Sequence, residues 1–372
     1  MAWYPVCQYL MAQGCKVYRP KTQKSHDLRQ YFSKHTKSDH TDALTLAKMP
    51  LVDEDSLYEV YIRKKDVNTL KRLLKQREKL VAEATRYKQR IADILRFAVP
   101  GLSKAIKKLK PKVKREFLKN YTNPHNIKNL GQKRLQKWLS RRMKDENKAK
   151  KSAAKIHRTC IEAIEIYRKK DTLDFTAINE EVNRYLRLLE NLAQEIRELK
   201  IKIKKTYQKT SPDKLLTSIP GLGEIAAPLV YALIGDANRF PNEKAQRGWI
   251  GLVPGKDSSG FKDRKGVKCT KAGPNQLKHM LYLAADVARQ YDPQIAKVYY
   301  REMVKKGNCH TKAVCACATR LSNRIRAVLR EGRRYDFRDT EGNKISKKKA
   351  RILAQNRWQV PEEVRKRLRN SN

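Results

Sequence analysis

A regular apolar pattern between Val182 and Ile203 constrains the fold more than any other part of the sequence. Apolar residues recur there at alternating steps of three and four, the spacing that keeps one face of a helix against a partner helix. The positions are Val182, Tyr185, Leu189, Leu192, Ile196, Leu199 and Ile203. An ordinary long core helix is an alternative, but the strict alternation and the charged flanks favour a coiled coil or an antiparallel helix hairpin.

A second long helix is expected over residues 66–98, where apolar residues again recur at helical spacing and Lys and Arg fill the other face. The intervening residues 101–171 are very basic and helical in pattern, with a break at Asn123-Pro124. Ser211-Pro212 is expected to end the helix that carries the heptad pattern. The sequence therefore predicts a helical and coiled-coil region over residues 66–208.

Residues 1–65 are the only stretch with mixed α/β character. We expect a helix over Trp3–Ala12 that ends at Gly14, and a strand over residues 15–19 closed by Pro20. Such a helix–strand unit is half of a parallel-sheet motif. After the helical region, residues 209–335 are expected to form a compact domain and residues 336–372 a basic tail. The predicted fold class is mainly α, with one α/β segment at the N-terminus.

The charge balance indicates the class of partner. Lys and Arg number 85 against 38 Asp and Glu, which gives a formal net charge of +47 and a pI near 10.1. Self-repulsion of this size is costly unless a polyanion is bound, so we expect a nucleic acid partner. Solubility alone is a weak explanation, because acidic residues serve it at least as well. No membrane partner is expected, since the sequence has no lipidation signal, no secretory signal and no run of 18 apolar residues.

The cysteines predict a reducing compartment. They number seven, an odd count scattered along the chain, which favours free thiols and a cytoplasmic protein over a disulfide framework. Four residues, Cys309, His310, Cys315 and Cys317, could be mistaken for a zinc site. They lack paired C-x-x-C spacing and lie in an Ala-rich helical pattern, so we do not expect zinc there.

The strongest local motif surrounds Ile219-Pro220-Gly221-Leu222-Gly223. Two short helices joined by this Gly-apolar-Gly turn would form a helix-hairpin-helix, with Leu222 filling the core between them. Glycine permits a tight turn and a close approach to phosphate, which the N-terminus of the second helix would face. We expect Gly221 and Gly223 to contact DNA without reading its sequence. A plain structural turn is the alternative interpretation.

A loop rich in Gly and Pro follows, between Gly251 and Pro274. It contains Ser258-Ser259-Gly260, where a serine would be accessible to a phosphodiester. The cations expected to contact DNA and to stabilise pentacovalent charge are Lys256, Arg264 and Lys271. A serine nucleophile needs a base or a strongly cationic pocket. From the residues alone, this segment is therefore mostly typical of a turn.

Asp39 and Asp42 lie three residues apart at an expected helix start. That spacing places both carboxylates on one face, with about 5–6 Å between their Cβ atoms, so that they can share a divalent cation. Two carboxylates alone rarely hold the pair of Mg²⁺ ions used in phosphodiester chemistry. Capping of the helix by Asp39 is an equally good interpretation.

These three features occur in the order and spacing of the insertion sequence 110 family of transposases, with relatives 116 and 902, which this chain resembles. The resemblance covers nearly the whole chain up to about residue 335. The matching segments are Lys37-Ser38-Asp39-His40-Thr41-Asp42-Ala43, Ile219-Pro220-Gly221-Leu222-Gly223, Gly251-Leu252-Val253-Pro254, Ser259-Gly260, Thr270-Lys271-Ala272-Gly273, Tyr299-Tyr300, Lys306-Gly307 and Ala313 onward.

The resemblance implies a RuvC-like, RNase H-fold domain with an Asp-Glu-Asp-Asp metal site, a coiled-coil middle and a C-terminal domain with a nucleophilic serine. It identifies Ser259 as the group that attacks DNA, and Asp39 and Asp42 as two of the four acids that hold Mg²⁺. The family's first Asp and its Glu precede the helix at Trp3, so we expect a truncated domain with an incomplete metal site. A structured guide RNA is also implied. So is a homo-oligomer, in which the acidic site assists the serine.

The leading function is transposition of an insertion sequence by DNA strand cleavage and rejoining, as the resemblance implies. Two alternatives stay open. One is a non-catalytic DNA- or RNA-binding remnant of such a transposase. The other is a junction-binding protein that uses the helix-hairpin-helix alone.

Overall fold

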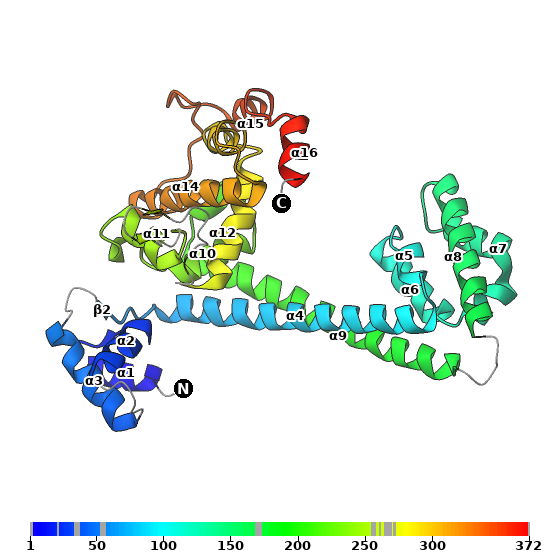
Figure 1. The fold of residues 1–372 in the computed structure, drawn as a ribbon, viewed down its shortest axis with the longest axis horizontal. Coiled ribbons are helices and arrows are strands. Elements are labelled where there is room, and N and C mark those ends of the chain that lie inside the picture. The colour runs from blue at the N-terminus through cyan, green and yellow to red at the C-terminus, as the bar shows by residue number, and fades with distance from the viewer. Residues whose placement is uncertain are drawn as a thin grey trace. The chain divides into compact units, whose positions relative to one another are not determined.

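The computed structural model describes residues 3–20, 22–32, 38–52, 57–167, 173–253, 258–259, 262–263, 270 and 273–370. The chain divides into two compact units, Met1–Lys64 and Lys65–Asn372, and helices dominate both (Figure 1). The mainly helical fold class is confirmed. The finer boundaries at residues 208 and 335 stay predictions. None of the helices in the described ranges is long and apolar enough to span a bilayer.

The first unit contains short helices and one small strand pair. Its elements are α1 (Trp3–Ala12), β1 (Tyr18–Arg19), α2 (Thr22–Phe32), α3 (Asp39–Val52) and β2 (Tyr58–Glu59). The predicted first helix is confirmed, but the strand pairs antiparallel, with Tyr18 opposite Glu59, so the expectation of parallel pairing was wrong for it. Helices α2 and α3 pack on each other and return the chain in the opposite direction. A RuvC-like sheet stays a prediction.

Two long helices begin and end the next region, α4 (Lys65–Ala98) and α9 (Phe175–Thr210), which pack along each other (Figure 1). Lys209 Nζ lies 3.3 Å from the Asp66 carboxylate, and the Tyr87 and Tyr185 rings lie 5.6 Å apart, so the helices run antiparallel. None of the seven heptad residues is exposed. The expected helix hairpin is therefore present, while supercoiling stays a prediction. We call this pair the stalk.

Four helices between the two stalk helices form a separate body, which we call the lobe (residues 101–167). They are α5 (Leu102–Ala105), α6 (Pro111–Tyr121), α7 (Pro124–Ser140) and α8 (Glu146–Ile166). Phe117, Leu135 and Ile156 are fully buried in its core, which the ends of α4 and α9 complete. The predicted break is confirmed, because Asn123 caps α7 by accepting the N–H of His125 at 2.9 Å.

The C-terminal half forms a second core around α12 and α14, joined by one end of the stalk. Its elements are η2 (Leu215–Ser218), α10 (Ala226–Ile234), η3 (Ala237–Arg239), α11 (Glu243–Ile250), β3 (Ser258–Ser259), β4 (Lys262–Asp263), α12 (Asn275–Ala288), α13 (Pro293–Tyr300), η4 (Arg301–Lys305), α14 (His310–Glu331), α15 (Lys347–Asn356) and α16 (Glu362–Asn370). Helix α12 packs on α10 and α14, so it ties the segment around Gly221 to the rest of this core.

A buried ion pair fixes α13 against α14. The Asp292 side chain is fully buried, its Oδ1 accepts the N–H groups of Gln294 and Ile295, and Arg324 donates to its Oδ2 at 2.6 Å. Arg324 also donates to the Gln294 side chain at 2.7 Å, and the Tyr335 hydroxyl contacts both charged groups. Breaking a buried pair by removing one partner costs about 3–5 kcal/mol. The start of α13 is thus specified by long-range chemistry.

The segment predicted as a basic tail is folded onto this core. Ala350 and Ala354 are buried in α15, which packs on α13, and Val360 is 2% exposed within the C-terminal core. The prediction missed this because the many Lys and Arg residues hide two alanines spaced one helical turn apart.

Candidate functional site

The turn between η2 and α10 contains the predicted helix-hairpin-helix motif. Its first element is a single 3₁₀ turn, η2, rather than an α-helix, and α10 begins at Ala226 without a side-chain cap. Leu222 is 2% exposed, so it fills the core as expected. Action of this turn as a DNA-binding helix-hairpin-helix stays a prediction.

Gly221 packs closely against α12. Its φ is 90°, and a Cβ at this position would lie 2.1 Å from the backbone carbonyl oxygen of Ala284. No side chain fits there, so glycine is required both by the left-handed backbone and by the neighbouring helix. The sequence suggested an approach to phosphate as the reason for this glycine. The structure supplies a packing reason, and contact of Gly221 with DNA stays a prediction.

Gly223 is the exposed glycine of the same turn. No heavy atom lies within 4 Å of the position that its Cβ would take. The adjacent Glu224 forms ion pairs with Lys200 at 3.0 Å and Lys204 at 3.6 Å, and the hydrogen bond from Lys200 lowers the pKa of the Glu224 carboxyl group. An open backbone position is therefore flanked by two lysines of α9. The sequence analysis missed them, because no local spacing links α9 to this turn.

The serine loop, residues 254–269, is closed at its base by two contacts. The N–H of Thr270 donates to the carbonyl oxygen of Val253 at 3.0 Å. Gly273 lies so close to α11 that a Cβ would be 2.2 Å from the carbonyl oxygen of Trp249. The Thr-Lys-Ala-Gly motif thus joins the end of the loop to α11, and its glycine is explained by this close approach.

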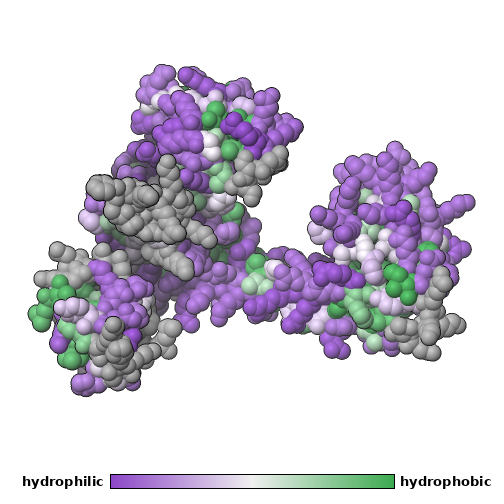
Figure 2. Space-filling model, in the orientation of Figure 1, coloured by the Kyte–Doolittle hydropathy of each residue, from purple (hydrophilic) through white to green (hydrophobic). Residues whose placement is uncertain are grey.

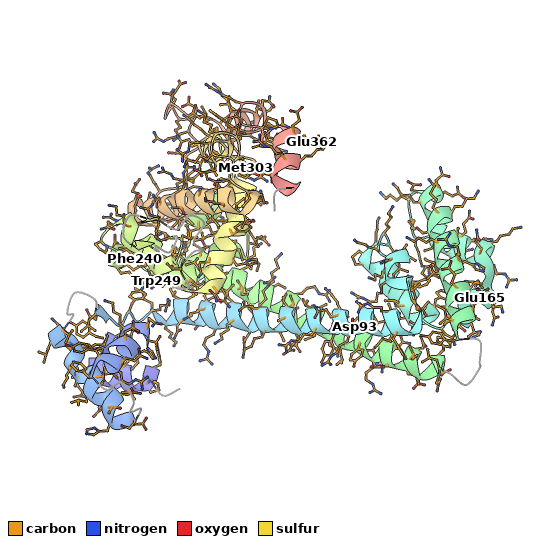
Figure 3. The ribbon with its side chains drawn as sticks, viewed as in Figure 1. Asp93, Glu165, Phe240, Trp249, Met303 and Glu362 are labelled. Carbon is orange, nitrogen blue, oxygen red and sulfur yellow. The ribbon has the colours of Figure 1, made fainter. Side chains whose placement is uncertain are left out.

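Two aromatic rings in contact anchor α11 at the base of the serine loop. Phe240 and Trp249 lie together in the C-terminal core (Figure 3), and the Arg239 guanidinium lies 4.4 Å from each ring centroid. Such cation–π contacts stabilise by about 0.5–1 kcal/mol at exposed sites and more when desolvated. The loop therefore starts from a well-anchored helix.

Ser259 lies on a short hairpin within the loop. Strands β3 and β4 pair antiparallel, with Ser258 opposite Asp263 and Ser259 opposite Lys262. Three predicted DNA contacts lie outside the described residues, namely Lys256, Arg264 and Lys271. Convergence of these cations on a phosphate beside Ser259 stays a prediction.

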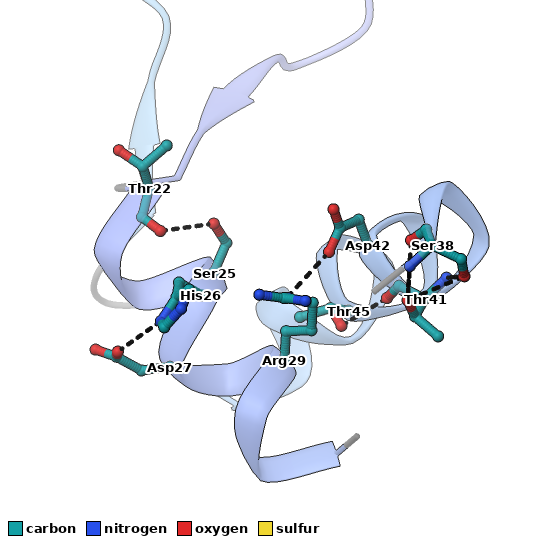
Figure 4. A network of polar contacts seen from close by, with 9 residues as sticks. All are labelled: Thr22, Ser25, His26, Asp27, Arg29, Ser38, Thr41, Asp42 and Thr45. Carbon is teal, nitrogen blue, oxygen red and sulfur yellow. Dashed lines mark hydrogen bonds and ion pairs between the residues drawn. The ribbon is translucent and has the colours of Figure 1, made fainter. Parts of the chain in front are cut away.

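Asp39 and Asp42 both lie in the first turn of α3. The cap of this helix is Ser38, whose Oγ accepts the N–H of Thr41 at 3.2 Å, while Thr41 Oγ1 accepts the N–H of Ser38 at 3.0 Å (Figure 4). The alternative interpretation of Asp39 as the cap was therefore wrong. Capping does not explain an acid at position 39.

Asp42 is engaged by Arg29 of α2, which the sequence analysis did not single out. Arg29 Nε lies 3.3 Å from Asp42 Oδ1, and the two side chains are 16% and 46% exposed (Figure 4). A Mg²⁺ ion on Asp42 would have to displace this guanidinium. Over the described residues, no group of three potential metal ligands gathers. In this arrangement, the two acids do not fit a site for two Mg²⁺ ions.

Replacing Arg29 with Gln is expected to raise the Mg²⁺ affinity of the full chain about three- to tenfold. A competing ion pair of this kind is worth up to about 1 kcal/mol, and the guanidinium also repels the cation. Isothermal titration with MgCl₂ measures the change. The double variant Arg29→Gln/Asp42→Asn should return to weak binding. An affinity that is the same in parent and Arg29→Gln would show that Asp42 is not a cation ligand.

The residues that could be mistaken for a zinc site have other contacts. The Cys317 thiol is buried and donates to the carbonyl oxygen of Ile295 at 3.6 Å, and burial raises its pKa to about 12. His310 Nδ1 lies 2.8 Å from the Tyr299 hydroxyl. A thiol with so high a pKa is a poor metal ligand, since the thiolate is the binding form. These contacts connect α13 and α14.

Two family models match the chain. The one described as "Transposase IS116/IS110/IS902 family" matches residues 213–301, which include the hairpin turn, the serine loop and α12. A second, described as "Transposase" and specific to IS110 elements of the DEDD type, matches residues 1–100. Together they span just over half of the chain. The chain belongs to the IS110/IS116/IS902 family of transposases.

Curated relatives agree with this membership. A 43.6 kDa protein of insertion element IS110 from Streptomyces coelicolor is 25% identical over 334 residues, 90% of this chain and 80% of the relative. A 44.8 kDa protein of insertion element IS116 from Streptomyces clavuligerus is 25% identical over 270 residues, 72% of this chain and 65% of the relative. A pilin gene-inverting protein of Moraxella lacunata is 27% identical over 124 residues, 33% and 38% of the two chains. Transposases and recombinases act on DNA, which is the partner class that the net charge predicts.

Proposed function

We propose that this chain transposes an insertion sequence by cutting and rejoining DNA strands, with Ser259 as the attacking group. Family membership carries the proposal, because the matched region contains the serine loop and the hairpin turn together. The two contacts that close the base of the serine loop support this proposal. A nucleophile carried on a loop needs fixed loop ends if its hydroxyl is to be oriented toward one phosphate.

The reaction would proceed by exchange of one phosphodiester for another. The Ser259 Oγ attacks phosphorus, a serine–phosphate bond forms, and the bond to the leaving strand's oxygen breaks. The serine proton is transferred to a base, and the leaving oxygen takes up a proton. Rejoining reverses these steps, with a strand hydroxyl as the attacker. A serine hydroxyl is a poor nucleophile at neutral pH, so its activation must come from outside the loop.

The turn at Gly223 is proposed to grip the DNA backbone. Its open backbone position and the neighbouring Lys200 and Lys204, two cations that share the single acid Glu224, together offer space and net positive charge to a phosphate. Contacts of this kind position DNA without reading bases. Lys256 and Arg264 of the serine loop, and Lys271 just after it, are proposed to hold the same strand.

Further parts of the proposal concern ligands and partners. Asp39 and Asp42 are proposed to contribute to Mg²⁺ binding when Arg29 is displaced, and no reaction step is drawn through that ion. A structured guide RNA is a proposed partner, since a polyanion suits a chain of net charge +47. A homo-oligomer is also proposed, as the family resemblance implies.

Two other functions predict different outcomes. A non-catalytic remnant would bind DNA or RNA and never form a covalent adduct. A junction-binding protein would prefer branched DNA through the turn at Gly223, without need of the serine loop. The open position of Gly223 is the observation that keeps the junction binder under consideration.

DNA affinity of the purified chain is expected to fall steeply with salt. If six to ten phosphates are neutralised, the affinity for duplex or branched DNA should drop by about 10³–10⁵ between 50 and 200 mM salt. Fluorescence anisotropy with labelled duplex, branched DNA and structured RNA measures this dependence. A nearly flat salt response would contradict binding driven by phosphate contacts, and with it the proposed function.

A further inference from the structure

The lobe concentrates positive charge in a part of the chain that lies between the two family matches. Residues 101–167, all of which are described, hold twenty Lys and Arg against five Asp and Glu. The matched stretches end at residue 100 and resume at residue 213. The charge therefore cannot be explained by the serine loop or the hairpin turn, which lie in the C-terminal core.

Most acids of the lobe are already neutralised. Glu116 pairs with Arg142 at 2.5 Å, Asp145 with Lys148 at 2.9 Å and Glu162 with Arg158 at 3.4 Å. With few acids left, the surplus of cations faces solvent. The upper part of the lobe is mainly hydrophilic in the view of Figure 2, while apolar side chains appear toward its lower end.

One side of α8 carries a row of cations, which we call the α8 row. Its members follow each other at steps of three and four, so they lie along one side of the helix over about 15 Å. They are Lys148, Lys151, Lys155 and Arg158, and all four are exposed. Lys148 and Arg158 each also contact one acid, Asp145 and Glu162 respectively, so a phosphate would share these two cations with a carboxylate. A duplex of that length presents about nine backbone charges, at one per about 1.7 Å. The row is thus long enough to contact several phosphates along one duplex.

A groove between α7 and α8 continues this surface. It is lined by Gln132 of α7 and by Ala154, Lys155, His157, Arg158 and Ile161 of α8, so hydrogen-bond donors and apolar side chains share its wall. Helices α7 and α8 pack against each other beneath it.

The lobe lacks the feature that single-stranded nucleic acids require. Surfaces for single strands stack bases on exposed aromatic rings. Phe117, Tyr121 and Trp138 instead pack on one another in the core of the lobe, and Arg142 stacks on Trp138 at 4.1 Å. From Gly101 to Tyr167, no Phe, Tyr or Trp side chain is exposed, whereas Phe97, at the end of α4 next to the lobe, is 61% exposed. The surface of α7 and α8 is therefore suited to the backbone of a duplex.

We propose that the lobe is a second, sequence-independent binding surface for a nucleic-acid duplex, with the α8 row contacting its phosphates. This inference rests on the proposed function in one respect, namely that the chain binds DNA. It adds a contact separate from the serine loop. A surface that reads only phosphates does not distinguish a DNA duplex from an RNA duplex, so both are binding partners of the same chemistry.

The test is the triple variant Lys151→Gln, Lys155→Gln and Arg158→Gln in the full chain. Gln retains the helix propensity of these residues, and circular dichroism checks the fold. The matched control removes three charges elsewhere, in the exposed run Lys347→Gln, Lys348→Gln and Lys349→Gln. Affinity for a short blunt-ended DNA duplex, the matching RNA duplex and a single strand is measured as a function of salt.

The α8 variant is expected to lose at least about tenfold in affinity for both duplexes near 0.1 M salt, and its salt slope should fall by about 0.9 for each lost phosphate contact. The control variant should change much less. Equal losses in the two variants would overturn the inference, since net charge alone would then explain them. So would a loss confined to the single strand, or an unchanged α8 variant. If the α8 variant is unchanged while the parent chain binds DNA with a steep salt dependence, the inference about the lobe fails and the proposed function is not contradicted.

Discussion

Ser259→Ala is expected to abolish any covalent adduct between this chain and DNA while leaving its DNA affinity almost unchanged. The substitution removes the oxygen that would bond to phosphorus, whereas affinity comes from phosphate contacts with cations and N–H groups elsewhere. A suicide DNA substrate, in which the cleaved strand cannot rejoin, traps the adduct. Peptide mass spectrometry then locates the modified residue.

Ser258→Ala is the matched control, because it removes the same hydroxyl group one residue earlier on β3. It should still form the adduct. An adduct on Ser258 or on a tyrosine would overturn the assignment of the nucleophile, and an adduct that persists in Ser259→Ala would overturn the mechanism. A parent chain that forms no adduct, on any substrate it binds, would favour the non-catalytic remnant.

Gly221→Val is expected to destabilise the C-terminal core strongly, whereas Gly223→Val is expected to leave its stability almost unchanged. A Cβ at position 221 would lie 2.1 Å from a backbone oxygen of α12, which cannot move aside as a side chain would, and the backbone there has φ of 90°. Overpacking costs about 1–3 kcal/mol or more, and the left-handed backbone about 1–2 kcal/mol more for a side chain with Cβ. Against a total stability of about 5–15 kcal/mol, the loss is large.

Urea unfolding followed by circular dichroism measures both variants. Gly223→Val meets no atom within 4 Å, so its stability should change by less than about 1 kcal/mol. Its DNA affinity should nevertheless fall, because the bulky side chain blocks the approach of a phosphate to the turn. A folded Gly223→Val variant that binds DNA like the parent would show that this turn is only structural. A fully stable Gly221→Val variant would contradict the packing described for α12.

The parts of the fold that could be predicted are those that depend on the spacing of residue types close together in the sequence. The heptad pattern from Val182 to Ile203 predicted a long helix with one buried face, because helical periodicity and burial repeat together. Asn123-Pro124 predicted a break between helices, and there the Asn123 side chain caps α7 while Pro124 takes the first helical position, where a missing N–H costs nothing. Both signals act over a few residues, which is why a sequence alone carries them.

The parts that could not be predicted depend on residues far apart in the sequence. Nothing near Gly221 indicates that Ala284 lies beside it, and nothing near Asp42 indicates Arg29. At the start of α3, Ser38 and Asp39 are both residue types that cap helices well. Only the hydrogen bond from the Thr41 N–H to Ser38 Oγ shows that Ser38 is the cap. The serine loop is a different case. Its motif is readable in the sequence, while its chemistry depends on side chains that must converge from several segments.

The division of buried residues along the stalk has a consequence for how the molecule comes apart. On α4, Leu70 and Leu74 belong to the C-terminal core, while Ile91 and Leu95 belong to the core of the lobe. At 1.5 Å per residue, about 25 Å of helix lies between the two groups. Only two helices cross this distance, so melting of the lobe removes few contacts from the other core. Residues 65–372 are therefore expected to unfold in two separate transitions. A single fitted melting temperature would then be an average over both unfolding events.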